Sequence, residues 1–294
     1  MTRQTRNWLI ALLVIYSAPV FVVCGLVAFL VLRPLPILPN PNGYGDLLNA
    51  ATLVSTNTAG HAKMSVEQLR PLVAENAGAL SLARGGLDKG CAVPVQYSQD
   101  GQRNMNGNYV KLRSLGAAFA AEARLAELEN RTGAAADSYV NVMRLGAATE
   151  HDGILIDAMV GCAIESLGST GLQKIANQAD ARTCRETAAA LEALDAVRPS
   201  WSAVLQQEDN WIRRTFGARP VLVEFVYHRQ MKRNGVKAQR VFQAEQLKAR
   251  RLTISFASRA YELDKGRRPA SAADLVPEYL KAVPKNPSTG KNLN

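Results

Sequence analysis

The amino-acid sequence predicts an all-α protein: one N-terminal transmembrane helix followed by an extracytoplasmic domain of antiparallel helices. Three observations lead to this prediction. An uncharged apolar run lies near the start, alanine- and leucine-rich segments with helical spacing fill most of the remainder, and no strand-like alternation persists. With 294 residues, 47% of them hydrophobic and 20% charged, the chain fits one anchored globular unit.

The predicted transmembrane helix covers residues 8–32 and follows a short tail, residues 1–7. The run contains no Asp, Glu, Lys, Arg or His. At about 1.5 Å per residue it spans about 37 Å, enough to cross a hydrocarbon layer of ~30 Å. Pro19 predicts a kink rather than a break, because inside the bilayer no water competes for the freed carbonyl. The run ends at Arg33 without the small residues of a cleavage site, which favours an uncleaved signal-anchor.

Flanking charge predicts the orientation. Arg3 and Arg6 precede the apolar run, whereas only Arg33 follows it closely. Basic flanks stay in the cytoplasm, so we expect the N-terminus inside and the large domain outside, in a periplasm or its equivalent. The expected location is the cytoplasmic (inner) membrane, with the lipid bilayer as the partner of residues 8–32.

The cysteines of the domain suggest neither a zinc site nor a redox motif. Cys91, Cys162 and Cys184 are odd in number and contain no Cys-x-x-Cys pair. A single bridge between Cys162 and Cys184 and a set of free buried thiols are both compatible with the sequence.

The remaining chain divides into a stalk at 33–45, a helical domain at 46–265 and a capping tail at 266–294. Four prolines between residues 34 and 41 favour an extended, semi-rigid stalk, which would lift the domain by roughly 25–30 Å. The apolar side chains of Leu35 and Ile37 allow the alternative that this segment packs back onto the domain.

Capping signals and apolar spacing predict where the helices lie. Ser65, Thr183 and Ser271 each precede a polar partner by three residues, which predicts helix starts there. The spacing predicts further helices at 107–130, 134–149, 153–178, 184–197, 200–216, 219–233 and 236–265. The glycines and asparagines of 90–107 predict a long loop.

One helical hairpin resembles a tetratricopeptide repeat. Small residues that let two helices approach, an aromatic residue that fills the gap and a turn between them carry the resemblance. These residues are Phe119, Ala123, Ala126, Asn130, Thr132, Ala135, Tyr139 and Leu145. Asn130 stands where the family usually has glycine, and the three or more repeats of a free-standing array are not found. We expect a helical hairpin at 119–145.

The tail is similar to the C-terminal part of type II secretion pseudopilins, and to the last segment of many N-terminally anchored bacterial proteins. The resemblance covers about 45 residues and rests on Tyr261, Asp264, Gly266, Pro269, Leu275, Pro277, Tyr279, Leu280 and the run from Val283 to Lys291. It implies a role in a secretion or pilus-like machine. The pseudopilin leader is missing, and the loop from 279 to 294 offers no carboxylate for the calcium of that family. We therefore expect a structural end-cap.

No catalytic, cofactor or metal site is predicted. His61, His151 and His228 lack partners at helical spacing. Glu150, His151 and Asp152 are consecutive, so they diverge by about 100° each on a helix, and we expect them to form a helix-end turn. An enzyme whose site is assembled from distant residues remains an alternative.

Charge is unevenly distributed along the chain. The formal net charge is +10, and the stretch from Arg213 to Arg251 sets many basic residues against only Glu224 and Glu245. It predicts a basic face made of Arg213, Arg214, Arg229, Lys232, Arg233, Lys237, Arg240, Arg250 and Arg251. Outside the membrane, such a face fits an acidic protein partner or anionic headgroups rather than nucleic acid. The sequence thus favours an envelope scaffold or interaction protein, with a secretion accessory subunit and an enzyme as alternatives.

Overall fold

The computed structural model describes residues 35–55, 58, 60–216 and 221–293, with the side chains of 102–104 and 221–234 left aside. The predicted tail at 1–7 and the predicted transmembrane helix at 8–32 lie outside the described residues. Within them the protein is all-helical, and an isolated bridge between Lys285 and Asn292 is the one β feature. The predicted fold class of the domain is confirmed.

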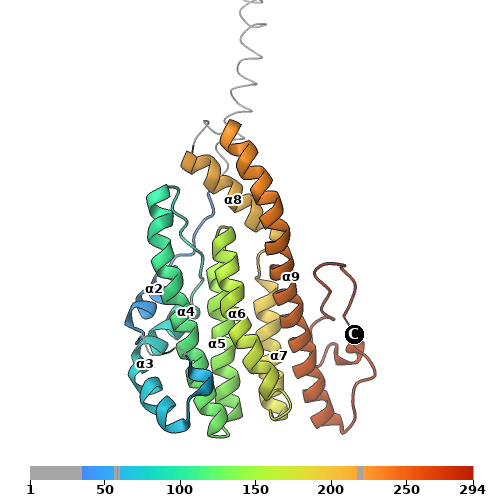
Figure 1. The fold of residues 1–294 in the computed structure, drawn as a ribbon. Helices are drawn as coiled ribbons and strands as arrows, with labels where there is room; N and C mark the ends of the chain where they lie inside the picture. The colour runs from blue at the N-terminus through green and yellow to red at the C-terminus, as the bar shows by residue number, and fades with distance from the viewer. Residues whose placement is uncertain (1–34, 56–57, 59, 217–220, 294) are drawn as a thin grey trace, which may run out of the picture.

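The helices form an elongated bundle (Figure 1). They are α2 (Tyr44–Leu53), α3 (Val66–Leu87), α4 (Gln99–Leu128), α5 (Thr132–Glu150), α6 (Leu155–Ile175), α7 (Ala181–Ala196), α8 (Trp201–Phe216) and α9 (Val221–Lys265), with short 3-10 turns η2 (His61–Lys63) and η3 (Ala272–Leu275). The pair α5 and α6 lies in the middle, with α2 to α4 on one side and α7 and α9 on the other. Helix α8 crosses one end of the bundle.

One continuous hydrophobic core connects these layers. Phe119 of α4, Leu145 of α5, Ile164 of α6 and Phe256 of α9 are all fully buried within it. Apolar burial of this extent is the main stabilising contribution to a domain of this size. Charged side chains described below enter this core from α5 and α6, and the packing of these helices holds them in place.

Glycines bring α5 and α6 into close contact. A Cβ atom added at Gly161 would lie 2.4 Å from Cγ of Glu150 and 2.6 Å from the carbonyl oxygen of Gly146. A Cβ added at Gly146 would lie 2.3 Å from Cγ of Glu165. Such distances are far below the optimal separation of non-bonded atoms. The two backbones can approach this closely only because both positions are glycine, and the approach encloses Glu150 and Glu165.

Replacing Gly161 with alanine is expected to lower the free energy of unfolding by about 1–3 kcal/mol, because overpacking outweighs the gain in helix propensity. Thermal unfolding of the full chain in detergent, followed by circular dichroism, measures the change. Gly78→Ala is the matched control, since a Cβ at Gly78 of α3 meets nothing within 4 Å and should stabilise the helix by up to about 1 kcal/mol. A Gly161→Ala variant as stable as the parent would contradict the close helix contact.

Helix α6 is the one helix in the described part of the chain that is long and apolar enough to cross a membrane. Its most apolar 18-residue window is 56% buried inside the domain. It packs against α4, α5 and α9. A helix buried to this extent is typical of the core of a domain.

The helix boundaries differ from the predictions at three places. Helix α4 starts at Gln99, so the second half of the predicted loop at 90–107 is helical, because the Ser98 hydroxyl caps the helix by accepting from Gly101 N at 3.0 Å. Helix α7 starts at Ala181 because Asp180, not Thr183, is the cap. The helices predicted at 219–233 and 236–265 form the single helix α9.

Two start signals and the hairpin are confirmed. Ser65 forms a capping box with Gln68 at the start of α3, and Ser271 forms one with Asp274 at η3. Helices α4 and α5 pack as the hairpin predicted at 119–145. Asn130 adopts a positive φ of 59° at the turn, a conformation that asparagine tolerates better than most residues.

The stalk touches the domain at several of its described residues, although the Ile37 side chain is 96% exposed. Leu35 and Pro36 line a small pocket with residues of α8, and Pro39 lies beside Gly90. The amide of Asn42 donates to the carbonyl of Ala92 at 2.8 Å. These contacts show that residues 35–42 run along the domain surface, so the expectation of a free-standing spacer is wrong for this segment.

The tail is part of the core. Leu275 and Leu280 are buried, and the Tyr279 ring lies 5.5 Å from that of Tyr261 on α9, tilted by 59°. The Tyr279 hydroxyl donates to Asp264 at 3.0 Å. The tail therefore packs against the core through these residues, and the helix start predicted at Ser271 gives only the 3-10 turn η3.

Candidate functional site

Four basic residues of α9 share one outward face. At 100° per residue, Lys237, Arg240, Lys248 and Arg251 fall within an arc of about 80°. Lys237, Arg240 and Arg251 are exposed, and none of them pairs with a carboxylate among the described residues. The Lys248 ammonium donates to the Thr170 hydroxyl at 3.0 Å. We call these four residues the basic stripe.

Other members of the predicted basic face lie elsewhere. The Arg250 guanidinium donates to both carboxylate oxygens of Asp195, at 3.0 and 2.8 Å, and to the carbonyl of Lys285 at 2.6 Å. It therefore ties α9 to α7 and to the tail. On α8, Arg213 pairs with Asp209 at 2.9 Å, and Arg214 lies 5.4 Å from the centre of the Tyr97 ring. The side chains of Arg229, Lys232 and Arg233 lie outside the described residues.

An ion cluster is buried where α5, α6 and the α7–α8 connection meet. The Arg198 side chain is only 1% exposed, and its Nη2 donates to both oxygens of Glu165, at 2.6 and 2.5 Å. Its Nη1 lies 3.8 Å from Oε2 of Glu150, whose side chain is fully buried. The Cys162 thiol donates to Oε1 of Glu150 at 3.4 Å. Glu150, Cys162, Glu165 and Arg198 are called the ion cluster below.

The ion cluster disfavours ionisation of Glu150. One guanidinium faces two carboxyl groups, so two ionised carboxylates would leave a net negative charge in the interior. Burial raises the pKa of Glu150 well above its usual range, and the charge of Glu165 raises it further. Burial alone would lower the pKa of Arg198, but Glu165 and Glu150 outweigh burial and raise it. Burial also raises the pKa of Glu165, but Arg198, which lies closer to Glu165 than to Glu150, opposes that shift.

A second pair of acidic residues caps α6. Asp157 accepts from Ile154 N at 2.8 Å, and Glu208 of α8 accepts from Leu155 N at 2.9 Å. Acceptors at a helix N-terminus satisfy free amide groups and interact favourably with the helix dipole. Burial raises the pKa of Asp157 to about 7, while hydrogen bonds from Ile154 N and from Tyr109 oppose the shift. These contacts fix α8 to the bundle.

The ion cluster is suited to stabilising the fold, and its Cys162 thiol is not suited to act as a nucleophile. Burial raises the pKa of the Cys162 thiol, and the charges of Glu150 and Glu165 raise it further, so the thiol stays protonated at neutral pH. Cys91, Cys162 and Cys184 are all unbridged, so the alternative of a Cys162–Cys184 disulfide is wrong. Within the described part of the chain, no three His, Cys, Asp or Glu residues are grouped to hold a metal ion.

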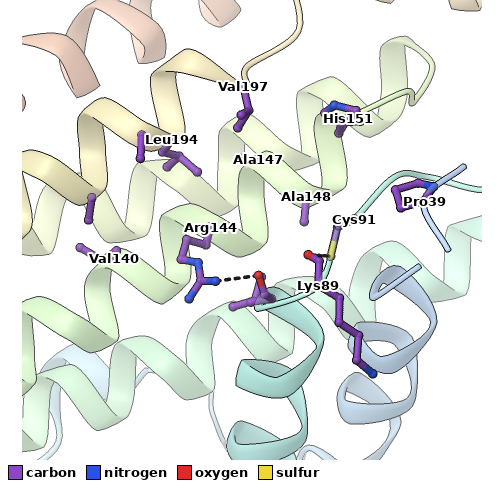
Figure 2. Close-up of a pocket in the computed structure, with 14 residues that line it drawn as sticks. Pro39, Lys89, Cys91, Val140, Arg144, Ala147, Ala148, His151, Leu194 and Val197 are labelled. Atoms are coloured by element: carbon purple, nitrogen blue, oxygen red, sulfur yellow. Dashed lines mark hydrogen bonds between the residues drawn. The ribbon is translucent and has the colours of Figure 1, made fainter. Parts of the chain in front are cut away.

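A pocket of about 580 Å³ lies between α5, α7 and the loop that follows α3 (Figure 2). Alanines form much of its wall, Ala147 and Ala148 on α5 and Ala190 and Ala193 on α7. Larger apolar side chains complete the lining, namely Leu87, Val140, Leu194 and Val197. Because small side chains occupy this helix crossing, α5 and α7 leave a trough between them. We call it the α5–α7 pocket.

Few polar groups line the α5–α7 pocket. Arg144 Nη2 donates to the carbonyl of Leu87 at 2.6 Å and to Asp88 at 2.8 Å. Lys89 also lines the pocket, and its ammonium donates to Asp46 at 2.6 Å. The Cys91 thiol donates to the backbone carbonyls of Gly86, at 3.4 Å, and of Lys89, at 3.7 Å (Figure 2). Burial raises the pKa of Cys91 to about 11, so this thiol is also protonated at neutral pH.

Sequence reasoning missed both the ion cluster and the α5–α7 pocket. Glu150 was interpreted as a member of a helix-end turn, which is correct for its backbone, since α5 ends there and Gly153 N donates to its carbonyl at 3.2 Å. The signal for its side chain was available on α6. Glu165 continues an apolar stripe with Gly161, Gly168 and Leu172 at helical spacing, and a carboxylate in such a stripe indicates a buried partner.

Comparison with known proteins found no matching family model, no matching curated protein and no matching solved structure.

Proposed function

We propose that this protein is a membrane-anchored envelope scaffold or interaction protein. Residues 8–32 cross the cytoplasmic membrane with the N-terminus inside, and the helical domain lies outside. The basic stripe on α9 binds an acidic protein partner.

The basic stripe is the observation that carries this proposal. Lys237 and Arg251 are 14 residues apart, which corresponds to about 21 Å along the helix. The three exposed members have no acidic partner among the described residues, whereas Arg250, one position before Arg251, is fully engaged. Exposed unpaired cations in a row produce a local positive potential that attracts an extended acidic surface.

The position of the stalk supports a domain held close to the membrane. Leu35 and Pro36, the first described residues, lie against Pro199 and Ala203 at the α8 end of the bundle. If residues 8–32 span the bilayer, only two residues separate the anchor from this contact. The α8 end then faces the membrane, and α9 runs away from it.

The two alternative functions, a secretion accessory subunit and an enzyme, have less support. The tail that resembles pseudopilins is packed into the core through Leu275 and Leu280, which is the role of an end-cap. The ion cluster, which could serve an enzyme, is paired internally and closes the α5–α6 contact.

Charge reversal of the basic stripe is the test. The triple variant Lys237→Glu, Arg240→Glu, Arg251→Glu is expected to capture the partner at least about tenfold more weakly at low ionic strength. The intact chain is used in a pull-down from native membranes. Binding by the parent should also weaken as salt increases, since salt screens exposed charges.

The matched control reverses three exposed basic residues of other helices, Lys111 and Arg113 on α4 and Arg182 on α7. Its net charge equals that of the stripe variant, so a non-specific charge effect would weaken both equally and would contradict the proposal. A reporter enzyme fused after the C-terminus, active only outside the cytoplasm, tests the orientation separately. Activity restricted to the cytoplasm would remove the envelope location.

A further inference from the structure

The α5–α7 pocket has the composition of a ligand site. Its volume of about 580 Å³ falls within the range of small-molecule pockets, roughly 300–1,000 Å³. Such pockets are mainly apolar and contain a few fixed polar groups. Here the walls come from two core helices, and the polar groups come from the α5 residue Arg144 and from the loop after α3.

We propose that the α5–α7 pocket binds a single acyl chain that ends in a carboxylate, as in a long-chain fatty acid. The acyl chain lies in the alanine-lined trough between α5 and α7. The carboxylate lies beside Arg144, on the α5 side of the trough. The inference does not depend on the basic stripe, because the two sites use different residues.

The trough suits an acyl chain because its walls are apolar and carry small side chains. Ala147 and Ala148 form one side, and Ala190 and Ala193 form the other. Val197, which also lines the pocket, is 62% exposed. An acyl chain would remove this apolar surface from water, at a gain of about 25 cal/mol for each Å² covered.

The charge of the lining selects an anionic head. Arg144 is the cation that this head would meet, since the Lys89 ammonium is paired with Asp46 at 2.6 Å, and no carboxylate is among the lining residues. Arg144 is held in place by the carbonyl of Leu87, so its guanidinium is oriented before a ligand arrives. Its present carboxylate partner, Asp88, has a side chain that is 71% exposed, so this ion pair is weak in water. A ligand carboxylate partly shielded by the pocket can replace Asp88 with a stronger, bidentate contact.

Photo-crosslinking tests the proposal on the full chain in nanodiscs. The probe is a long-chain fatty acid with a diazirine on its acyl chain, and the crosslinked peptides are identified by mass spectrometry. We expect crosslinks in the α5 and α7 peptides that contain Ala147 and Ala193, and competition by an unlabelled fatty acid. Crosslinks restricted to residues 8–32, where the probe meets the anchor in the bilayer, would overturn the proposal.

Two variants on α7 test whether the pocket itself holds the chain. Ala193→Trp fills the pocket and should abolish the α5 and α7 crosslinks. Ala189→Trp places the same ring on an exposed position of the same helix that does not line the pocket, and should leave the crosslinks unchanged. Equal crosslinking of the two variants would contradict the binding site.

A third comparison tests the anionic head without filling the pocket. Arg144→Gln is expected to lower crosslinking of the carboxylate probe about tenfold, the size expected for loss of one charge-assisted contact. The same variant should leave crosslinking by the matching fatty-alcohol probe unchanged. If the alcohol probe labels the parent as well as the carboxylate probe does, the assignment of an anionic head is wrong.

Discussion

Replacing Arg198 with methionine is expected to lower the free energy of unfolding by about 3–5 kcal/mol, the largest effect of any single substitution considered. The substitution keeps most of the side-chain volume but removes the cation that donates to Glu165 at 2.6 and 2.5 Å. Glu165 would then be left as a buried carboxylate without a partner, or would have to take up a proton. Urea unfolding of the full chain in detergent at neutral pH, followed by circular dichroism, measures the loss.

A second substitution shows whether the lost charge pairing is the cause. Arg198→Met combined with Glu165→Gln is expected to recover most of the stability, because a neutral buried cluster carries no unpaired charge. The surface control is Arg182→Met, whose side chain is 79% exposed and 4.0 Å from Glu186, with an expected change below about 0.5 kcal/mol. Equal losses in Arg198→Met and Arg182→Met would show that the ion cluster does not stabilise the fold as described.

Replacing Asp157 with asparagine is expected to make the stability of the protein less dependent on pH. The pKa of Asp157 is raised from 3.8 to about 7 in the folded state, chiefly by burial. The folded protein therefore keeps a proton that the unfolded chain loses, so the contribution of Asp157 is full below pH 4 and is lost as the pH rises to 7. A shift of this size corresponds to at most about 4 kcal/mol. Asparagine is neutral throughout and can still accept from Ile154 N.

The measurement compares the melting temperatures of variant and parent at pH 5 and at pH 8. The difference, variant minus parent, should be more positive at pH 8. Asp180→Asn is the control, because Asp180 caps α7 and hydrogen bonding to Thr183 lowers its pKa. Asp180 is ionised at both pH values, so its substitution should cost the same at pH 5 and at pH 8. A parallel response of the two variants would contradict the raised pKa of Asp157.

Local signals predicted most of the helices, and their limits explain the errors. The ends of α8 were predicted within one residue, since apolar spacing marks the face that enters the core. Two helices were predicted on either side of Gly235. Helix α9 is instead continuous there, because a glycine inside a long helix costs only about 1 kcal/mol. The asparagines near 104 suggested a loop, but the cap at Ser98 starts the helix before them.

Composition predicted the basic face, but the fold brings only some of its residues onto one surface. A count of basic residues treats Arg250 and Arg251 alike. On α9, however, Arg250 lies about 140° from Lys237, while Arg251 lies about 40° from it. Arg250 consequently turns to Asp195 and the tail, and Arg251 faces outward.

The ion cluster and the α5–α7 pocket depend on topology, which a single sequence does not reveal. Arg198 is 33 residues from Glu165, and no spacing rule joins a connection between two helices to the middle of an earlier one. Likewise, Ala147 and Ala193 become neighbours of one pocket only once α5 and α7 pack side by side. Burial and pairing of such residues are properties of the complete bundle.

Helix α9 has 45 residues and is therefore about 67 Å long, so it sets the height of the whole domain. The basic stripe covers about 21 Å in the middle of this length and does not reach the α8 end. With that end toward the bilayer, a protein bound to the stripe stands beside this one, at the same level above the lipid. Complexes built in this way spread laterally as a layer parallel to the membrane, whereas contacts through the far end would have stacked them outward.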